Sequence, residues 1–333
     1  MYKKIYSEDK IFVAGAYGMV GSAICRSLIK KGYGDPNIGG TLLTPSRKEL
    51  NLLNINEVEK WFKLNKPSVV IIAAAKVGGI IANSTMPTEF LLENIKIQTN
   101  LIETSWKNGV RRLLFLGSSC IYPKNSPQPI REEYLLDGLL EKTNESYAIA
   151  KISGLKLCES LRLQKNFDCI SVMPTNLYGP GDNYHPENSH VMASLIKKFS
   201  EAKNNSKPYV TCWGTGKPLR EFLHVHDLSD ACLFLLEKWN PSLLNAPRDN
   251  NKNKLYHLNI GTGKEISIKE LAFKIASLIN YKGKIIWDKT KPDGTLRKRL
   301  DTSKINQMGW FPKIDLDEGI KSTIHEFDIG IFK

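Results

Sequence analysis

The sequence predicts an α/β protein, with a parallel, doubly wound sheet and a smaller second domain toward the C-terminal end. Three observations support this prediction. Short apolar runs alternate with segments of helical spacing, a glycine-rich turn follows the first apolar run, and the alternation loosens after residue 179. Alternating strands and helices favour parallel strands with helices on both faces of one sheet. The 333 residues suffice for one large domain or two coupled domains.

The order of the elements follows from the apolar pattern. The run "PSVVIIAAA" is continuous, as expected for a strand that is buried on both faces. Such runs predict strands over residues 11–15, 41–44, 67–75, 112–117 and 169–179. Helical spacing predicts helices over residues 19–31, 55–63, 88–108, 147–166, 191–203 and 266–279. The polar stretch 245–254 is expected to be an exposed insertion.

Composition and charge limit the classes of function. No apolar stretch reaches the roughly 20 residues that span a bilayer, and residues 1–10 lack the apolar core of a signal peptide. We therefore expect a cytoplasmic protein without a membrane partner. The net charge of +13 is dispersed along the chain, so we expect no nucleic-acid partner and a positive field that attracts a polyphosphate. The six cysteines show no C-x-x-C pair, which predicts neither a disulfide framework nor a metal site.

A glycine-rich turn, "GAYGMVG", joins the first predicted strand to the first predicted helix. Gly15 allows the tight turn, Gly18 lets a pyrophosphate approach the backbone, and Gly21 lets the helix pack on the strand. The free N–H groups at the helix N-terminus favour bound phosphates. This is the Rossmann-type arrangement, and it predicts a dinucleotide cofactor that also contacts Ala16, Tyr17, Met19 and Val20.

The segment "LLTPSRKEL", after the second strand, indicates which dinucleotide binds. NAD enzymes usually carry an acidic residue there, which holds the ribose hydroxyls. No acid precedes Arg47, whose guanidinium is placed to meet a 2′-phosphate, so we expect NADP; an incidental surface arginine is the alternative. We predict an NADP-binding domain over residues 1–178 with parts of 220–260, and a substrate-binding domain over 179–219 and 261–333.

Tyr147 and Lys151 lie four residues apart in "SYAIAK", so a helix places them on one face. An ammonium beside a phenol favours the phenolate, and we therefore expect Lys151 to lower the pKa of Tyr147. Such a pair suits a proton donor to a carbonyl that receives a hydride, and Lys151 can also hold the nicotinamide ribose. The spacing alone is common on surface helices. The glycine-rich turn and Ser118, which ends a strand, give it significance.

This combination resembles the extended short-chain dehydrogenase/reductases that act on nucleotide sugars. Over residues 10–308 the chain is similar to the GDP-L-fucose synthase family, most specifically in "SSCIYPK" and "NSHV" and also in "AAAKVGGIIAN", "GTGKPLREFLHV" and "KPDGTLRK". The resemblance implies NADPH-dependent conversion of GDP-4-keto-6-deoxy-D-mannose to GDP-L-fucose, by epimerisation at C3 and C5 and then reduction at C4. A reductase or epimerase of another 4-keto nucleotide sugar is the alternative. The resemblance also implies a homodimer packed through the two long helices.

The resemblance assigns the catalytic roles as well. The C4 ketone makes the hydrogens at C3 and C5 acidic, and inversion needs a base on one face and an acid on the other. The family pattern gives these roles to Cys120 and His190, where a cysteine at a strand end would otherwise be a packing residue. Ser118 and Tyr147 would hold the enolate oxygen, and Tyr147, assisted by Lys151, would then protonate it.

Further contacts follow the same resemblance. Many bacterial relatives carry a basic residue where this chain has Tyr17, so the preference for NADP depends on Arg47 alone. His224 and His226 have no third candidate ligand nearby in sequence, and we interpret them as structural. Arg220 matches the phosphate-binding arginine, and the other expected substrate contacts are Lys198, Trp213, Lys291 and Asp293, with core packing as the alternative for Trp213. The other expected cofactor contacts are Leu116, Gly117, Ser118, Ser119, Lys151, Pro174, Thr175, Asn176, Leu177 and His190.

Overall fold

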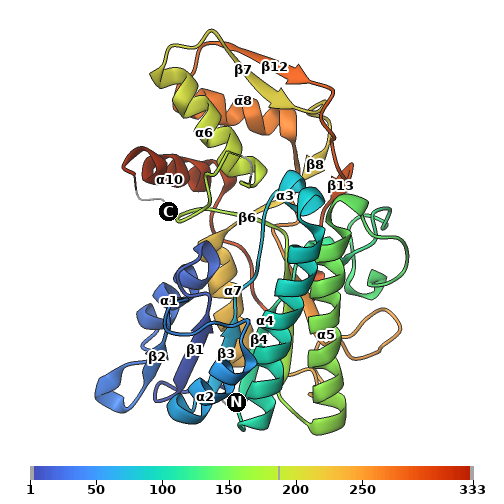
Figure 1. Cartoon of the computed structure of the whole chain (residues 1–333). Helices are drawn as coiled ribbons and strands as arrows, with labels where there is room; N and C mark the ends of the chain where they lie inside the picture. Colours follow the sequence, from blue (N-terminus) through green and yellow to red (C-terminus); the bar gives the residue numbers. More distant parts are fainter. Residues whose placement is uncertain (1–3, 187, 331–333) are drawn as a thin grey trace.

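A parallel sheet of six strands, in the order β10-β5-β4-β3-β1-β2, forms the centre of the larger part of the molecule (Figure 1). The structure is a computed structural model that describes residues 4–186 and 188–330; the ends of the two predicted domains, residues 1–3 and 331–333, lie outside the described residues. The strand order reverses direction between β1 and β3, which places a ligand crevice at the carboxyl ends of the strands there. The six strands are β1 (Lys10–Ala14), β2 (Thr41–Leu43), β3 (Val69–Ile72), β4 (Arg112–Leu116), β5 (Cys169–Pro174) and β10 (His257–Ile260).

Helices cover both faces of this sheet, because its strands are apolar on both sides. In β1, Ile11 and Val13 face one core, whereas Phe12 and Ala14 face the other. The first core is covered by α1 (Met19–Lys30) and α7 (Val225–Lys238), and the second by α2 (Ile55–Asn65), α4 (Pro87–Lys107) and α5 (Glu145–Lys165). The predicted doubly wound α/β class is therefore confirmed.

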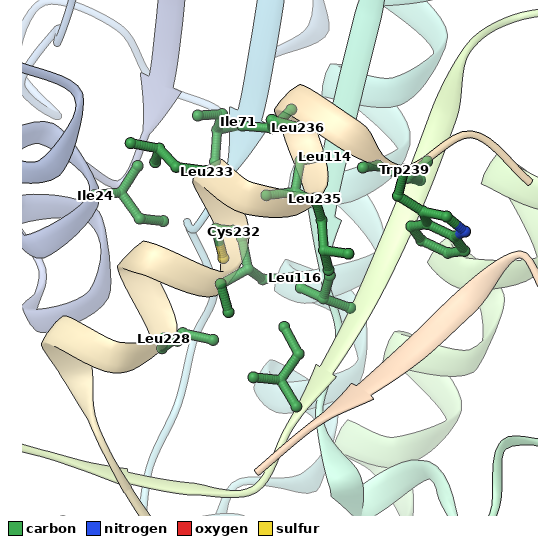
Figure 2. Packing of buried hydrophobic residues seen from close by; sticks show 14 of the residues in the cluster. Ile24, Ile71, Leu114, Leu116, Leu228, Cys232, Leu233, Leu235, Leu236 and Trp239 are labelled. Carbon is green, nitrogen blue, oxygen red and sulfur yellow. The ribbon is translucent and has the colours of Figure 1, made fainter. Parts of the chain in front are cut away.

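Figure 2 shows the core on the α7 side of the sheet. Leu114 and Leu116 of β4 alternate with residues that face the other core, and here they meet Cys232 and Leu235 of α7. Ile24 of α1 closes the same cluster. All of these side chains are almost inaccessible to solvent, so the carboxyl end of β4, which carries the predicted site residues, is anchored by dense packing.

A smaller layer lies beyond the carboxyl ends of the strands, at the top of Figure 1. Its core packs α6 (Val191–Asn204), α8 (Ile268–Ile279) and α10 (Leu316–Asp328) against the parallel pair β7 (Tyr209–Trp213) and β12 (Lys284–Asp288). The chain enters α8 through a capping box, in which Ser267 and Glu270 satisfy each other's backbone N–H groups. The other short α-helices and strands are α3 (Ile80–Thr85), α9 (Ser303–Gln307), β6 (Asn176–Tyr178), β8 (Leu219–Arg220), β9 (Phe222–His224), β11 (Ile266–Ser267) and β13 (Arg297–Lys298). The exact limits of the two predicted domains stay a prediction.

The predicted strand over residues 169–179 is wrong as a single element. The strand β5 ends at Pro174, and after the N–H of Thr175 donates a hydrogen bond to the carbonyl oxygen of Ile260 over 3.0 Å, the chain leaves the central sheet. The side chains of Thr175 and Asn176 then donate hydrogen bonds to the backbone carbonyl of Glu221, over 3.2 and 2.7 Å, and β6 pairs with β9 instead. This departure carries residues 174–177 across the crevice at the end of the sheet.

The other predicted elements agree with the structure to within a few residues. The predicted insertion at 245–254 is largely exposed, and an antiparallel bridge between Arg248 and Lys254 closes it. The longest helices, α4 and α5, carry many polar side chains. No helix in the described part of the chain is long and apolar enough to cross a membrane.

Candidate active site

A cavity of about 410 Å³ lies between the end of the sheet and the smaller layer, and both parts of the chain line it. The ends of β4 and β5 form one wall, and α6, β7 and β8 form the other. Most of the predicted site residues meet here. Those that line the cavity are Met19, Val20, Gly117, Ser118, Ser119, Cys120, Tyr147, Pro174, Thr175, Asn176, Leu177, His190, Lys198, Trp213, Arg220 and Asp293.

The glycine-rich turn behaves as the sequence predicts. Gly15 has a φ of 84°, and a Cβ there would lie 2.7 Å from the backbone nitrogen of Ala74. A Cβ on Gly21 would lie 2.0 Å from the carbonyl oxygen of Gly15, so only glycine lets α1 pack this closely on its own turn. No side chain caps the N-terminus of α1 at Gly18, and its first turn has no acidic residue. These residues fit a dinucleotide phosphate, which would meet free N–H groups and the positive end of the helix dipole.

Arg47 lies exposed on the turn that follows β2. Since β2 pairs with β1 in parallel, this turn is at the same edge of the sheet as the glycine-rich turn. Ala16, Tyr17 and Leu116 lie near the cavity but outside its wall. Contact of Arg47 with a 2′-phosphate stays a prediction.

The strand β4 ends in a short 3-10 turn, Ser119–Ile121, that presents the candidate base. Ser118 begins this turn, and its hydroxyl oxygen accepts a hydrogen bond from the Cys120 N–H over 3.2 Å. Gly117 precedes it, and a Cβ there would lie 2.3 Å from the sulfur of Met173, so a larger residue would make that side chain shift. The Cys120 thiol therefore has a defined position at the cavity wall.

The Nζ atom of Lys298 donates a hydrogen bond to the Sγ atom of this thiol over 3.5 Å. Burial raises the pKa of Cys120, but the charge of Lys298, the hydroxyl of Ser118 and the charge of Arg220 together outweigh burial. The pKa of Cys120 thus lies below its ordinary value of 9.0. A lower pKa increases the fraction of thiolate, which is the form that acts as a base.

Two short strands bring the cations to the thiol. β13 pairs with β8 in parallel, and the register sets Lys298 beside Arg220. Arg220 is fixed further by hydrogen bonds that it donates to the carbonyl oxygens of Leu219, over 2.9 Å, and Asp293, over 3.3 Å. Together with Lys198, these side chains make the wall of the cavity cationic, as a diphosphate ligand requires.

Tyr147 and Lys151 share one face of α5, but the expected effect on the tyrosine is wrong. Lys151 is buried behind the wall and donates a hydrogen bond to the carbonyl oxygen of Leu116 over 2.9 Å; its Nζ atom is 5.9 Å from the centre of the Tyr147 ring. Burial and the charge of Cys120 raise the pKa of Tyr147, and a hydrogen bond with Ser118 offsets only part of this. The phenol is therefore protonated at neutral pH, which is the form that can donate a proton.

His190 precedes α6 and lines the same cavity. Its side chain is open to the cavity, yet the surrounding protein and the charge of Lys298 both lower its pKa. The imidazole is thus mainly neutral at pH 7 without a ligand. Lys298 acts on both candidate groups in the same sense, since a positive charge disfavours the protonated thiol and the protonated imidazole alike.

Three of the expected substrate contacts, Lys198, Trp213 and Lys291, lie close together. The Nζ atom of Lys198 is 4.8 Å from the centre of the Trp213 ring, and that of Lys291, which is outside the cavity wall, is 5.7 Å from it. Asp293 is engaged within the protein, because its carboxylate accepts hydrogen bonds from the Thr215 N–H and hydroxyl, each over 2.7 Å. Asp293 therefore shapes the wall rather than offering a free carboxylate.

Sequence reasoning missed several residues of this wall, of which Lys298 is the most important. It stands in "KPDGTLRK", from which only Lys291 and Asp293 were selected. The sequence feature that could have identified Lys298 is its place in this segment, which is typical of the family. Glu141, Thr143 and Asn144, just before α5, also line the cavity and had no signal of their own.

His224 and His226 have no part in this site. The Nδ1 atom of His224 accepts a hydrogen bond from the N–H of His226 over 3.3 Å, and so His224 caps α7. Its ring packs against Tyr178. Within residues 4–186 and 188–330, no three histidine, cysteine or acidic side chains are grouped as metal ligands would be.

Comparison with known proteins places this geometry in a family. The model described as the NAD dependent epimerase/dehydratase family matches residues 11–246. GDP-L-fucose synthase 1 of Arabidopsis thaliana is 52% identical over 314 residues, which are 94% of this chain and 91% of the relative.

Solved structures agree with this assignment. A GDP-6-OMe-4-keto-L-xylo-heptose reductase from C. jejuni has a TM-score of 0.89 and 33% identity, over 98% of this chain and 99% of its own. A GDP-L-fucose synthetase from Naegleria fowleri, bound to NADP, has a TM-score of 0.83 and 26% identity, over 98% of this chain and 95% of its own. The chain therefore belongs to the NAD-dependent epimerase/dehydratase family and, within it, to the GDP-L-fucose synthases.

Proposed function

We propose that this protein converts GDP-4-keto-6-deoxy-D-mannose to GDP-L-fucose, by epimerisation at C3 and C5 followed by NADPH-dependent reduction at C4. The observation that supports this most directly is the Cys120 thiol, held 3.5 Å from the Lys298 ammonium in the cavity that also contains Ser118, Tyr147 and His190. A simple reductase needs no activated thiol beside its tyrosine. An epimerase of a keto-sugar needs such a base.

The cofactor would be held by the glycine-rich turn and the N-terminus of α1, with Arg47 at the 2′-phosphate and Lys151 at the nicotinamide ribose. When bound, NADPH supplies the hydride. The open backbone around Gly18, where a Cβ would approach the Gly15 carbonyl oxygen no closer than 3.4 Å, leaves room for the phosphates. The ends of β4 and β5, which line the cavity, then border the nicotinamide.

Epimerisation would use the two groups that Lys298 influences. The Cys120 thiolate removes the proton next to the ketone, while Ser118 and Tyr147 donate hydrogen bonds to the enolate oxygen. His190 returns a proton on the opposite face. The negative charge of the bound substrate would raise the pKa of His190 toward the range in which it can act as an acid.

Reduction at C4 would reuse the same oxygen site. Tyr147 is a protonated phenol in this environment, so it can give its proton to the C4 oxygen as the hydride arrives. Arg220, Lys198 and Trp213, which line the same cavity, would hold the diphosphate and the sugar-nucleotide.

Deuterium exchange with solvent tests this proposal. Wild type and Cys120→Ser are incubated with GDP-4-keto-6-deoxy-mannose in deuterated water, with and without NADPH. We expect Cys120→Ser to lose uptake at C3 and C5 by about 100-fold or more, with NADPH binding unchanged. Cys212→Ser is the matched control, since Cys212 lines the same cavity but burial raises its pKa to about 11. Wild-type exchange in Cys120→Ser would contradict the proposed base.

A second candidate function, reduction of another GDP-linked 4-keto sugar, is favoured by the likeness to the GDP-heptose reductase. Products formed from several 4-keto nucleotide sugars separate the two. A fucose synthase should invert C3 and C5 before it reduces GDP-4-keto-6-deoxy-mannose. Reduction without inversion, with deuterium uptake absent in the wild type, would favour the second candidate.

We also propose a homodimer that packs through α4 and α5, which lie side by side on one face of the sheet (Figure 1). Leu92 on α4 and Leu163 on α5 are exposed apolar side chains that such an interface would cover. Sedimentation should show a dimer for the wild type and a monomer for the Leu92→Asp, Leu163→Asp variant. Leu64→Asp, at an exposed position of α2, is the control that should stay dimeric.

A further inference from the structure

Glu221 is an acidic residue that the proposed reaction does not use, and it is inaccessible to solvent, with 0% of its surface exposed. It stands between Arg220 of β8 and Phe222 of β9. One carboxylate oxygen accepts hydrogen bonds from the N–H groups of Thr262, over 2.6 Å, and Gly263, over 2.8 Å. The other accepts a hydrogen bond from the N–H of Leu300 over 2.8 Å.

These bonds join three segments that are remote in sequence. Leu300 follows Lys298 by two residues. The carboxylate therefore binds the chain just after β13, the strand that carries the cation beside Cys120. The backbone carbonyl oxygen of Glu221 accepts hydrogen bonds from the side chains of Thr175 and Asn176, which also line the cavity. One residue thus links both walls of the site.

The surrounding chain is built for a carboxylate at this place. A Cβ on Gly261 would lie 2.1 Å from the Oε1 atom of Glu221, so only glycine leaves space for it. Each of the three partners is a backbone N–H donor, and a carboxylate offers acceptors only. A glutamine would turn its NH₂ group toward one of these donors and leave that bond unmade.

We propose that Glu221 is a positioning residue that holds the β8–β13 pair against the end of β4, so that Lys298 and Arg220 keep the Cys120 thiol activated. It acts through these cations and touches no reacting atom. The inference rests on the proposed function for its catalytic meaning, but its physical content, the reactivity of one thiol, does not depend on turnover.

The groups that face Cys120 come from several elements. Lys298 on β13 and Arg220 on β8 are the cations, and Ser118 at the end of β4 supplies a hydrogen bond. Tyr147 on α5 also faces the thiol, and the thiolate charge raises the pKa of its phenol. A shift of β13 changes the Lys298 distance while leaving Ser118 and Tyr147 in place, because these belong to the central sheet and α5.

Alkylation of Cys120 by iodoacetamide, followed by mass spectrometry of its peptide as a function of pH, tests the proposal. We expect Lys298→Met to raise the midpoint pH by about one unit, as for loss of an ion-pair partner. Glu221→Gln should raise it in the same direction, and the double variant should show no further rise. At neutral pH a rise of one unit slows alkylation about threefold, because the smaller thiolate fraction is partly offset by higher nucleophilicity.

Glu265→Gln is the matched control. Glu265 binds the guanidinium of Arg297 on the same strand β13, but from the solvent side. Its loss should leave the midpoint at the wild-type value. Urea unfolding of each variant confirms that the fold is intact before alkylation is measured.

A wild-type midpoint in folded Glu221→Gln would overturn the proposal, and so would additive rises in the double variant. If Glu221→Gln does not fold, Glu221→Asp replaces it, because a side chain shorter by one methylene cannot reach all three donors. A raised midpoint in that variant supports the proposal, and a wild-type midpoint overturns it. Failure of the exchange assay with normal alkylation behaviour would instead count against the proposed function alone.

Discussion

The Nζ atom of Lys151 donates a hydrogen bond to the carbonyl oxygen of Leu116, 2.9 Å away, at a place where only 4% of the lysine surface is exposed. The acceptor of this bond is neutral, so no opposite charge offsets the burial of the ammonium. Burial therefore lowers the pKa of Lys151 to about 8. At neutral pH the protein holds a buried, protonated ammonium beside its candidate proton donor.

Replacing this lysine should stabilise the fold at neutral pH while it abolishes reduction. The buried charge costs at most roughly 3 kcal/mol, and the hydrogen bond and the neighbouring Phe115 ring recover part of it. We expect Lys151→Met to be more stable than wild type by about 1 to 2 kcal/mol at pH 7 in urea unfolding.

The pH dependence of that difference follows from the direction of the shift. Between the folded pKa of about 8 and the ordinary value of 10.5, the unfolded lysine binds a proton that the folded lysine has lost. Wild-type stability therefore rises with pH over this range, and the advantage of Lys151→Met shrinks. An equal difference at pH 7 and pH 10, or a variant less stable than wild type at pH 7, would contradict the interpretation.

His190 should respond to charges placed on or removed from the cavity. The surrounding protein and the charge of Lys298 lower its pKa, so GDP, which brings negative charge, should raise it. Lys298→Met should raise it as well, by roughly half to one pH unit. Titration of the histidine ring protons by NMR measures both effects, with His190→Asn to assign the signal. If the pKa of His190 changes neither with GDP nor in Lys298→Met, the charge of Lys298 does not control the titration of His190.

Two glycines, one in the first turn of α1 and one just after its C-terminal end, allow a comparison of the same substitution in a crowded and an open position. Gly21→Ala should destabilise the protein by about 3 kcal/mol or more and abolish NADPH binding, because its Cβ would meet the Gly15 backbone. Gly32→Ala meets no atom within 4 Å and costs only the strain of a φ of 77°, about 1 kcal/mol. Thermal unfolding and NADPH fluorescence report the two effects. Normal NADPH binding in Gly21→Ala would sink this account of the turn.

Arg47 should discriminate between the two dinucleotides. Arg47→Ala should weaken NADPH binding about tenfold or more, since a charge-assisted contact with the 2′-phosphate is lost. NADH, which lacks that phosphate, should bind as before. The exposed neighbour Lys48 provides the control variant Lys48→Ala. Equal losses for NADPH and NADH would show that Arg47 acts on the fold of the turn instead.

Much of the fold could be predicted because its signals are local. The strand β3 is a continuous apolar run, and the turn from Gly15 to Gly21 combines a motif with its expected context. The break after Pro174 was missed since residues on both sides of it are suitable for strands. What moves the chain there is Glu221, 45 residues away from Asn176, which no local pattern reveals.

The candidate site was predictable to the same extent and for the same reason. Ser118, Cys120 and Tyr147 stand in motifs, and the structure brings them to one cavity. Lys298 reaches that cavity through β8 and β13, strands of two residues each that are too short to show a period. The prediction that Lys151 lowers the pKa of Tyr147 was wrong. The spacing of two residues on a helix does not reveal that the ammonium donates its hydrogen bond to the Leu116 carbonyl oxygen instead.

The distance between Cys120 and Lys298 along the chain, 178 residues, has a consequence for the life of the protein before it is fully folded. The thiolate is the form that oxidants attack, so an activated cysteine is also a vulnerable one. While the ribosome is still making the chain, and in any molecule whose β8–β13 pair has come apart, Cys120 lacks its cation and is an ordinary, slowly oxidised thiol. Susceptibility to oxidative damage therefore arises only together with the completed site.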